Sequence, residues 1–422
     1  MSLHPWKPSR AEWNESAASH LYRRAAFGAS TDQLEDALQR GLRASVESIL
    51  ADDRPLQPMH EGITALLAQN DIADLQSWWL ALILSGKGAW RERLTLVWHN
   101  HFATSFDKVQ DVRLMNRQNE LFRSTGSGDF RELLHAVAKD TAMLLWLDGN
   151  ENKEGQPNEN FARELMELFG LGIGNYTEDD IQGAARALTG WGTKGRSSVF
   201  RERYHDTGEK RFLGRQGRLA AEDVIDAVLE QPACSYHIAH RILVEYVGPA
   251  PEKRHIGEVA AELVANEWNI GQTLRTLFLS ELFFAEASRR SRIASPVELV
   301  AGSIRALKAS IAPKRASELC AQMGQALFRP PNVKGWDGHE AWINVGTWIA
   351  RHNAMVEVAQ ATGSENPSGN SMDDLRATLL PGIDARHLET ALEHATRKSK
   401  GAEQATRLSA ALVLTAPEYH LA

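Results

Sequence analysis

Helix start and stop signals recur along most of this chain, and they constrain the fold more than any other feature. Ser30 and Gln33 have the spacing of a capping box, and Gly41 supplies a stop after the apolar positions that follow. Asp71 and Gly86 bracket another such segment. Apolar residues three and four positions apart between these signals predict amphipathic helices with one face turned to a core. The sequence therefore predicts a mainly α fold.

Other segments repeat this pattern of a polar first residue and helically spaced apolar residues. We predict helices that begin at Asp129 and Thr177, and helices over residues 220–229, 258–268, 273–284 and 297–307. No shift in composition divides the chain, and no internal repeat of useful period is present. We therefore expect a single large multi-helical domain over residues 1–422.

Two segments interrupt the helical pattern. Short β-rich runs at residues 198–200 and 211–213, separated by polar residues and Gly208, predict a small β-hairpin or loop insertion between residues 195 and 217. Residues 363–371 are rich in Gly, Ser, Asn and Pro, which predicts a flexible surface loop.

The charge balance and the cysteine content exclude several classes of protein. A formal net charge of -7 and a pI near 6.1 argue against nucleic-acid binding, which requires a basic surface. Cys234 and Cys320 stand apart without a C-x-x-C partner, so we expect neither a disulfide framework nor a cysteine-based zinc site. Both are expected to be small buried side chains.

No segment predicts a membrane span or an export signal. The longest apolar run, residues 78–84, is far shorter than the roughly 20 residues of a membrane helix. Arg23 and Arg24 form a twin-arginine pair, but the apolar stretch after them is too short for an export signal. A soluble, cytoplasmic protein is therefore expected.

The most informative polar stretch covers residues 158–169. At about 100° per residue, Asn160, Arg163, Glu164 and Glu167 share one helical face, and apolar residues occupy the opposite face. Carboxylates, an amide and a guanidinium on one face can bind a metal, orient a water molecule or hold a polar ligand. A solvated helix face with an Arg163–Glu167 ion pair has the same pattern, so both interpretations stay open.

Two histidines, His99 and His101, follow Trp98 in a second polar stretch. Residues two apart do not share a helical face, but they can converge at a helix end or in an extended turn. Beside Glu164 and Glu167 they would suit a divalent metal such as zinc, iron or manganese. Satisfied core histidines are the alternative, because neither H-E-x-x-H nor the Glu-x-x-His pairs of di-iron bundles occur.

Two further stretches place polar and aromatic side chains outside the predicted helices. One follows the helix that begins at Thr177, and the other contains two prolines and a glycine at residues 330–336 that force a fixed, non-helical path. Both arrangements suit ligand contact and also suit simple packing. The candidates for ligand binding in these stretches are Trp191, His205, Asp206, Asn332, Lys334 and Trp336.

Several ordered motifs connect the chain to a known family. They are residues 21–28 (LYRRAAFG), 98–102 (WHNHF) with Lys108, 158–165 (NENFAREL), 189–191 (TGW), 205–206 (HD), 295–298 (SPVE), 323–325 (MGQ), 330–336 (PPNVKGW) and 416–419 (APEY). On these motifs the chain resembles, nearly from end to end, the bacterial proteins grouped as domain-of-unknown-function family 1800. The family motifs coincide with the polar stretches above, which favours a shared polar pocket.

The resemblance implies no settled activity. Family members are often encoded beside a sulfatase-like family that carries twin-arginine signals. The resemblance therefore implies a sulfatase-like partner protein and, as the alternative to the cytoplasm, a periplasmic location reached by co-export.

Two hypotheses of different classes follow. The first is a metal- or carboxylate-dependent hydrolase or transferase, in which Glu164 and Glu167 act as base or ligand and His99 and His101 as ligands or proton carriers. In that enzyme, Arg163 or Lys334 would hold an anionic group. The second is a non-catalytic partner or maturation factor, in which the same motifs form a binding groove or a structural network.

Overall fold

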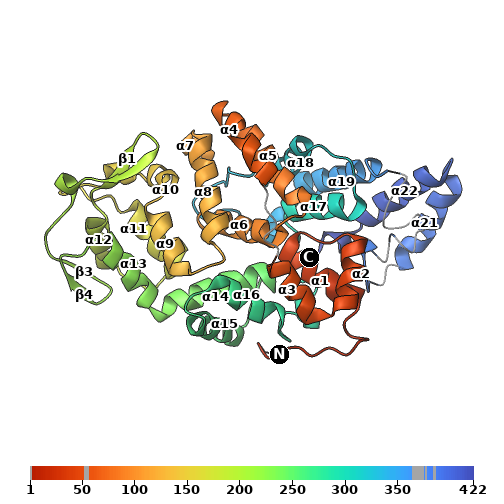
Figure 1. Ribbon diagram of the computed structural model, residues 1–422, viewed down its shortest axis with the longest axis horizontal. Helices are drawn as coiled ribbons and strands as arrows, with labels where there is room; N and C mark the ends of the chain where they lie inside the picture. Colours follow the sequence, from red (N-terminus) through yellow and green to blue (C-terminus); the bar gives the residue numbers. More distant parts are fainter. Residues whose placement is uncertain (1, 52–56, 364–374, 376–377, 384–385) are drawn as a thin grey trace.

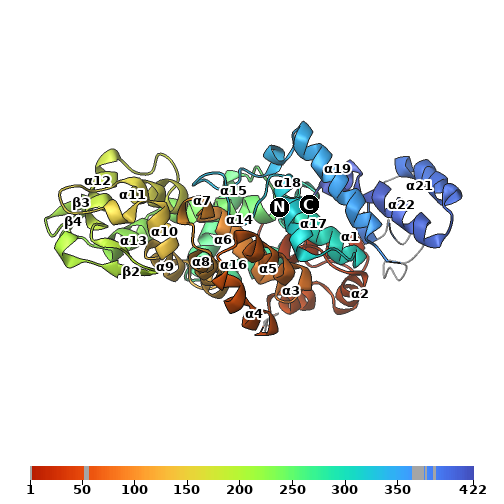
Figure 2. The ribbon, with the colours of Figure 1, turned by 90° about the horizontal axis from the view of Figure 1, so that it is seen from above.

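Helices dominate the computed structural model, which describes residues 2–51, 57–363, 375, 378–383 and 386–422. The molecule is elongated, with the strands at one end, helices α21 and α22 at the other, and both termini in the middle part (Figures 1 and 2). The mainly α prediction is confirmed. The predicted loop at 363–371 lies, except for its first residue, outside the described residues.

The first part of the chain contributes central helices (Figure 1). Its caps are those predicted: Ser30 and Gln33 form the capping box of α2, and the Asp71 side chain accepts from the Ala73 amide at the start of α5. These helices are α1 (Glu15–Ala26), α2 (Thr31–Arg40), α3 (Leu42–Leu50), α4 (Gln57–Ala68), α5 (Ile72–Ser85), α6 (Ala89–His101), α7 (Phe106–Val109) and α8 (Val112–Thr125).

The middle of the chain forms the end that carries the strands (Figure 1). Its helices are α9 (Phe130–Ala138), α10 (Thr141–Trp146), α11 (Asn160–Glu164), the π-helical segment η2 (Leu165–Gly170), α12 (Glu178–Ala187) and α13 (Ala221–Glu230). The strands are β1 (Trp191–Lys194), β2 (Ser197–Phe200), β3 (Lys210–Phe212) and β4 (Arg215–Gly217).

The prediction of one hairpin over residues 195–217 needs correction. The two β-rich runs do not pair with each other: β1 pairs with β2 and β3 pairs with β4, both antiparallel. Gly195 and Gly214, both with positive φ, close the two tight turns. The first hairpin therefore begins at Trp191, earlier than expected.

The last part of the chain returns through the centre to the opposite end (Figure 2). Its helices are α14 (Pro232–Tyr246), α15 (Lys253–Ala265), α16 (Ile270–Phe278), α17 (Pro296–Leu307), α18 (Pro313–Gln322), α19 (Val345–Gln360), α21 (Arg386–Lys398) and α22 (Ala402–Leu414). The helix predicted over 273–284 ends earlier, because the amides of Glu281 and Leu282 donate to the carbonyl groups of His4 and Ser2.

Two apolar clusters fill the interior, and α6 lies between them. Trp90, Val97 and Trp98 of α6 belong to the cluster formed with α1, α9 and α12–α16, whereas Leu96 belongs to the cluster of α5, α17, α18, α19 and α22. Cys234 lies in the first cluster, and Cys320 lies in the second; both are buried and free, as predicted.

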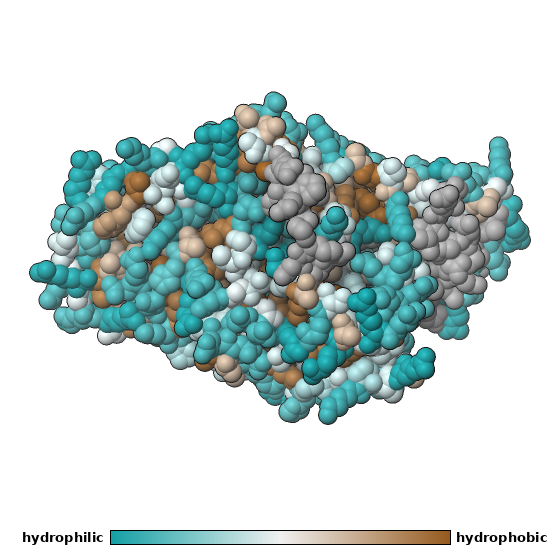
Figure 3. Space-filling view, in the orientation of Figure 1, coloured by the Kyte–Doolittle hydropathy of each residue, from teal (hydrophilic) through white to brown (hydrophobic). Residues whose placement is uncertain are grey.

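The visible face in Figure 3 is mostly hydrophilic, and its hydrophobic residues occur as small separate patches. In the described part of the chain, no helix combines the length and apolar character needed to cross a bilayer. The apolar residues thus serve mainly to build the two interior clusters.

Candidate functional site

The predicted carboxylates lie on α11 and η2. Glu164 ends α11, and Glu167 follows in the π-helical turn. A π-helical turn is wider than an α turn, so the 100° spacing assumed from the sequence does not continue past Glu164. The half-buried carboxylates nevertheless remain on the polar side, because Phe161, Leu165 and Phe169 are buried in the core.

The predicted Arg163–Glu167 ion pair is wrong. Arg163 Nη2 lies 3.1 Å from Glu159 Oε2 and 2.9 Å from Glu178 Oε2, at the start of α12. Its Nη1 also donates to Glu178 Oε1 at 3.0 Å, so the pair with Glu178 is bidentate. These contacts, with the bond to Glu178 first, raise the pKa of Arg163 and occupy its guanidinium group.

Glu164 and Glu167 differ in their surroundings. Burial raises the pKa of Glu164, and the neighbouring Glu167 raises it further, whereas Lys334 and Arg163 lower it. Glu167 Oε2 accepts a hydrogen bond of 3.1 Å from the Tyr176 hydroxyl group. Burial and then this bond raise the pKa of Tyr176 to about 12. The structure thus brings Lys334 of one motif close to the carboxylates of another.

His99 is a core residue. Its side chain is buried, and its Nε2 accepts a hydrogen bond of 3.0 Å from the Phe328 amide. The rings of Trp79 and Trp336 lie 5.4 and 5.6 Å from the imidazole. Burial lowers the pKa of His99 to about 3, which favours the neutral form of the ring.

His101 supports the π-helical segment. Its Nε2 donates to the Phe169 carbonyl oxygen at 3.1 Å, and His237 Nε2 of α14 donates to the Leu168 carbonyl at 2.8 Å. Burial lowers the pKa values of both histidines, that of His237 to about 4. The two neutral imidazoles therefore satisfy carbonyl groups near the end of η2, where regular helical partners are missing.

Of the two interpretations of these positions, a metal centre and satisfied core histidines, the described contacts of the histidines fit the second. No group of three or more His, Cys, Asp or Glu side chains that could hold a metal ion occurs among the residues whose structure is described. The Nε2 atoms of His99 and His101 are both engaged with the backbone. The residues of this site therefore offer acid–base and hydrogen-bonding chemistry rather than a ready set of metal ligands.

Asn100 fixes the loop that carries Asn332, Lys334 and Trp336. Its Oδ1 accepts from the Trp336 amide at 2.7 Å, and its Nδ2 donates to the Trp336 carbonyl at 3.3 Å. Gly335 has a φ of 82°, and a Cβ there would lie 2.2 Å from Asn100 Oδ1, so only glycine fits. Trp336 is buried, whereas Asn332 and Lys334 are exposed.

Trp191, His205 and Asp206 lie together beside the first hairpin. The His205 Nδ1 atom lies 2.9 Å from the Thr189 carbonyl, and the Thr189 hydroxyl accepts from the Asp206 amide at 2.8 Å. Asp206 pairs with Arg186 at 2.7 Å, whose hydrogen bond lowers the pKa of that carboxyl group. This group is a structural network around a turn, separate from Glu164 and Glu167 in its contacts.

Asn160 makes a third, exposed set of contacts. Its Nδ2 donates to Asp148 Oδ2 at 3.2 Å, and Asp148 Oδ1 lies 2.7 Å from Lys108 Nζ. Lys108 also donates to the Trp146 carbonyl at 2.7 Å. Asn160 therefore faces Asp148 and Lys108.

A buried charged cluster, formed by Arg93, Glu245, Arg292 and Glu298, joins α6, α14 and α17. Arg93 Nη2 lies 3.2 Å from Glu245 Oε2 and 3.0 Å from Glu298 Oε1, and Arg292 donates to the same Glu298 oxygen. Burial alone would raise the pKa of Glu298, but Arg292 and Arg93 hold it far below its usual range. The cluster therefore stays ionised, and it links the two apolar clusters.

This charged cluster lines a cavity that the sequence analysis missed. The cavity has a volume of about 50 Å³, and Asn100, Trp336 and His339 also line it. One signal was available: Arg93 lies three residues after Trp90 and four before Val97, both of which face the core. A charged residue among core positions requires an oppositely charged or hydrogen-bonding partner, and the sequence alone does not show which residue that partner is.

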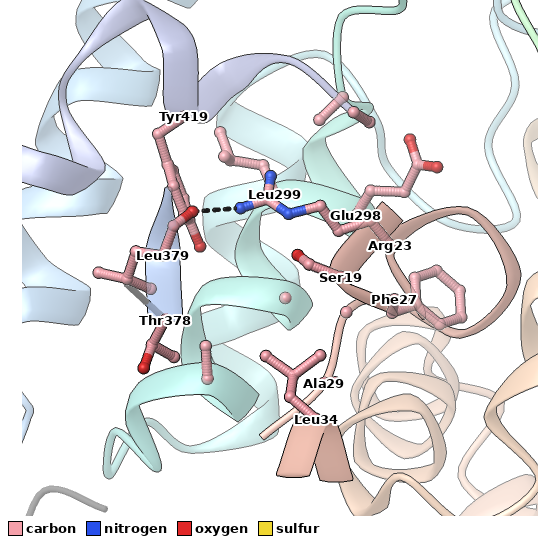
Figure 4. Close-up of a pocket in the computed structure, with 15 residues that line it drawn as sticks. Ser19, Arg23, Phe27, Ala29, Leu34, Glu298, Leu299, Thr378, Leu379 and Tyr419 are labelled. Atoms are coloured by element: carbon pink, nitrogen blue, oxygen red, sulfur yellow. Dashed lines mark hydrogen bonds between the residues drawn. The ribbon is translucent and has the colours of Figure 1, made fainter. Parts of the chain in front are cut away.

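A second cavity, of about 40 Å³, lies where the first and last family motifs meet (Figure 4). Arg23 Nη2 donates to the Leu379 carbonyl at 2.6 Å, and its guanidinium group lies 5.0 Å from the centre of the Tyr419 ring. Phe27 and Leu34 contribute an apolar wall. Arg23 therefore connects α1 to the segments that contain Leu379 and Tyr419.

The fold and these contacts define a mainly helical protein in which polar motifs tie distant segments together. A family model with the description "Protein of unknown function (DUF1800)" matches residues 20–421, so the chain belongs to that family. No curated protein and no solved structure matches the chain.

Proposed function

We propose that Glu164, Glu167 and Lys334 form the acid–base site of a hydrolase or transferase that acts on a substrate with an anionic group. The observation that carries this proposal is the half-buried Glu164, whose pKa is raised beside a second carboxylate and opposite a lysine from a distant motif. Two carboxyl groups in unequal surroundings are typical of acid–base catalysis.

The roles follow from the surroundings of each group. Glu167 accepts a hydrogen bond from the Tyr176 hydroxyl group, whereas burial raises the pKa of Glu164 and so makes its ionised form the stronger base. Glu164 is then the residue that takes a proton from an attacking water or hydroxyl group and returns it to the leaving group. Lys334, which is exposed, holds the anionic group of the substrate.

The test compares Glu164→Gln with a matched control, Glu159→Gln. Glu159 pairs with Arg163 on the same segment, so its replacement removes a carboxylate without touching the proposed site. Hydrolysis of 4-nitrophenyl acetate, phosphate and sulfate would be measured over a range of pH. For the ester that is turned over, Glu164→Gln is expected to lower kcat/KM by about 10²–10⁴-fold, and the control is expected to retain the wild-type rate.

The proposal fails if wild type and Glu164→Gln hydrolyse all three esters at the same rate, or if both variants lose activity equally. Melting temperatures of both variants serve as the folding readout. An unchanged melting temperature with lost activity supports a catalytic role, because a structural network would lose stability instead.

A second candidate function is that of a non-catalytic partner of a sulfatase-like protein. An exposed apolar patch at the start of α19 favours it, because exposed apolar groups of this kind are typical of interaction surfaces. The patch consists of Ile343, Val345, Trp348 and Ile349, whose exposed fractions are 37%, 81%, 37% and 56%.

Co-purification with the neighbour-encoded sulfatase-like protein tests this candidate. Val345→Asp is expected to abolish the complex, whereas Ile173→Asp, at an isolated residue with an exposed fraction of 77%, is expected to leave it intact. Recovery of the wild type only as a monomer would contradict the candidate. A cytoplasmic location, or a periplasmic one reached by co-export with this partner, belongs to the same proposal.

A further inference from the structure

The cavity beside the buried charged cluster has the size of a small ligand site. Its volume of about 50 Å³ exceeds the ~10–15 Å³ that one water molecule needs. Its walls come from α6, α14, the start of α17 and the segment from Trp336 to Trp342. Asp337 is exposed and Arg241 is half-buried, so the cavity reaches solvent at that side.

Three buried nitrogen atoms in the lining lack partners, and the two on arginine are donors. Nε of Arg93, Nε of Arg292 and Nδ1 of His339 are buried and have no hydrogen-bond partner within the described structure. The side chains of Arg93 and Arg292 are 2% and 5% exposed. Buried donors without partners cost free energy, and a ligand with acceptor oxygens would satisfy them.

The charges around the cavity do not balance. Arg24, Arg93, Arg292 and Arg351 all interact electrostatically with Glu298, and Arg241 interacts with Glu245, whose side chain is 17% exposed. With Asp337, which is exposed and also lines the cavity, five guanidinium groups therefore lie around three carboxylates; Arg24 and Arg351 stand outside the lining itself. A net positive charge in a low-dielectric interior is unfavourable unless an anion compensates it. Water can fill the cavity and satisfy donors, but it cannot supply that charge.

We propose that this cavity binds a tetrahedral oxyanion with two negative charges, either a free sulfate or phosphate ion or the dianionic end of a phosphate monoester. Such a group presents several acceptor oxygens to the planar guanidinium groups. Its two charges match the excess of two guanidinium groups over carboxylates around the cavity. The site is independent of the acid–base chemistry proposed for Glu164.

Calorimetric titration of the full chain with sodium sulfate and with inorganic phosphate tests the proposal. Acetate and chloride at the same ionic strength are the control anions, and they are expected to bind at least about ten-fold more weakly. Arg241→Gln is the test variant, because Arg241 lines the cavity outside the buried ion pairs; the half-buried side chain is expected to be replaceable without loss of the fold, which a thermal melt checks. It is expected to weaken sulfate binding by about ten-fold or more, as for a lost charge-assisted contact.

Arg315→Gln is the matched control, because Arg315 pairs with Glu318 and Glu357 far from the cavity lining. It is expected to bind sulfate as the wild type does. Phenyl phosphate distinguishes the two sources of the anion: tighter binding than inorganic phosphate indicates an ester end, and weaker binding indicates a free ion. No binding of either dianion, equal binding of acetate, or unchanged affinity in Arg241→Gln would overturn the proposal.

Discussion

Two polar regions of this molecule look alike in composition and differ in surroundings. The buried charged cluster places Arg93 and Glu298 in the interior, with side chains that are 2% and 5% exposed. The carboxylate region, where α11 meets the start of α12, keeps Arg163 and Glu178 in contact with solvent, at 37% and 71%. Charges in the first region are costly to unpair, whereas those in the second are cheap to rearrange and available to a ligand.

The strongest test of this contrast is Glu298→Gln. The variant removes the buried carboxylate that Arg93 and Arg292 share and leaves their charges undercompensated. The free energy of unfolding in urea is expected to fall by about 3–5 kcal/mol. The matched exposed change is Glu357→Gln, which breaks a surface pair with Arg315 and is expected to cost at most about 1 kcal/mol. Equal losses in the two variants would erase the distinction between the regions.

His99→Gln tests how the burial of one histidine affects the pH dependence of the stability of the fold. Burial lowers the pKa of His99 from 6.5 to about 3, so the unfolded chain takes up its proton first. Its contribution to stability is therefore complete above pH 6.5 and is lost as pH falls toward 3, by about 1.4 kcal/mol per pH unit. Urea unfolding between pH 6.5 and pH 4.5 is expected to show a slope shallower by that amount in the variant. Parallel curves for the two proteins would contradict this prediction.

Gly335→Ala tests the loop of residues 330–336, which carries Lys334 near Glu164 and Trp336 in the lining of the cavity beside the charged cluster. A methyl group there would lie 2.2 Å from Asn100 Oδ1, at a φ of 82°. The variant is expected to lower the free energy of unfolding by about 1–3 kcal/mol, because the loop must move from its hold on α6. Gly363→Ala, where nothing lies within 4 Å, is the control for replacing glycine with alanine in thermal melts. A similar loss in the control would mean that the Asn100 contact is unimportant.

Lys334→Met gives the smallest expected effect on stability, within about 0.5 kcal/mol, because Lys334 is exposed. Lys334 lowers the pKa of Glu164, so its removal is expected to raise that pKa further. Carbon-detected NMR titration of labelled glutamate measures this shift directly. An unchanged or lowered pKa would show that the lysine does not act on the carboxylate.

Local signals predicted the helices well. The capping boxes of Ser30 with Gln33 and Thr177 with Asp180 are present, since both depend on residues three positions apart. The end of α16 was missed because the competing partners, His4 and Ser2, lie far away in the sequence. Helix signals are local, and the contacts that shorten a helix often are not.

The candidate site was predicted only in part. Glu164, Glu167 and Lys334 were identified, but their approach depends on the loop held by Asn100 and on the π turn of η2. His101 of α6 and His237 of α14 hydrogen-bond to that turn, so no pattern within residues 158–169 predicts it. The polar motifs identified candidate residues, but they did not distinguish side chains that hydrogen-bond distant segments together from side chains that are exposed to solvent.

During synthesis, Arg93 is made long before the carboxylates that pair with it. Its carboxylate partners, Glu245 and Glu298, emerge from the ribosome about 150 and 200 residues later, roughly 10–40 s at ordinary elongation rates. During that time α6 has apolar residues for both interior clusters, but Arg93 has neither of these carboxylate partners until α14 is made and only one of them until α17 is made. We therefore expect the nascent chain to expose the apolar residues of α6 until α17 is made, and chaperones that hold unfolded chains to bind there.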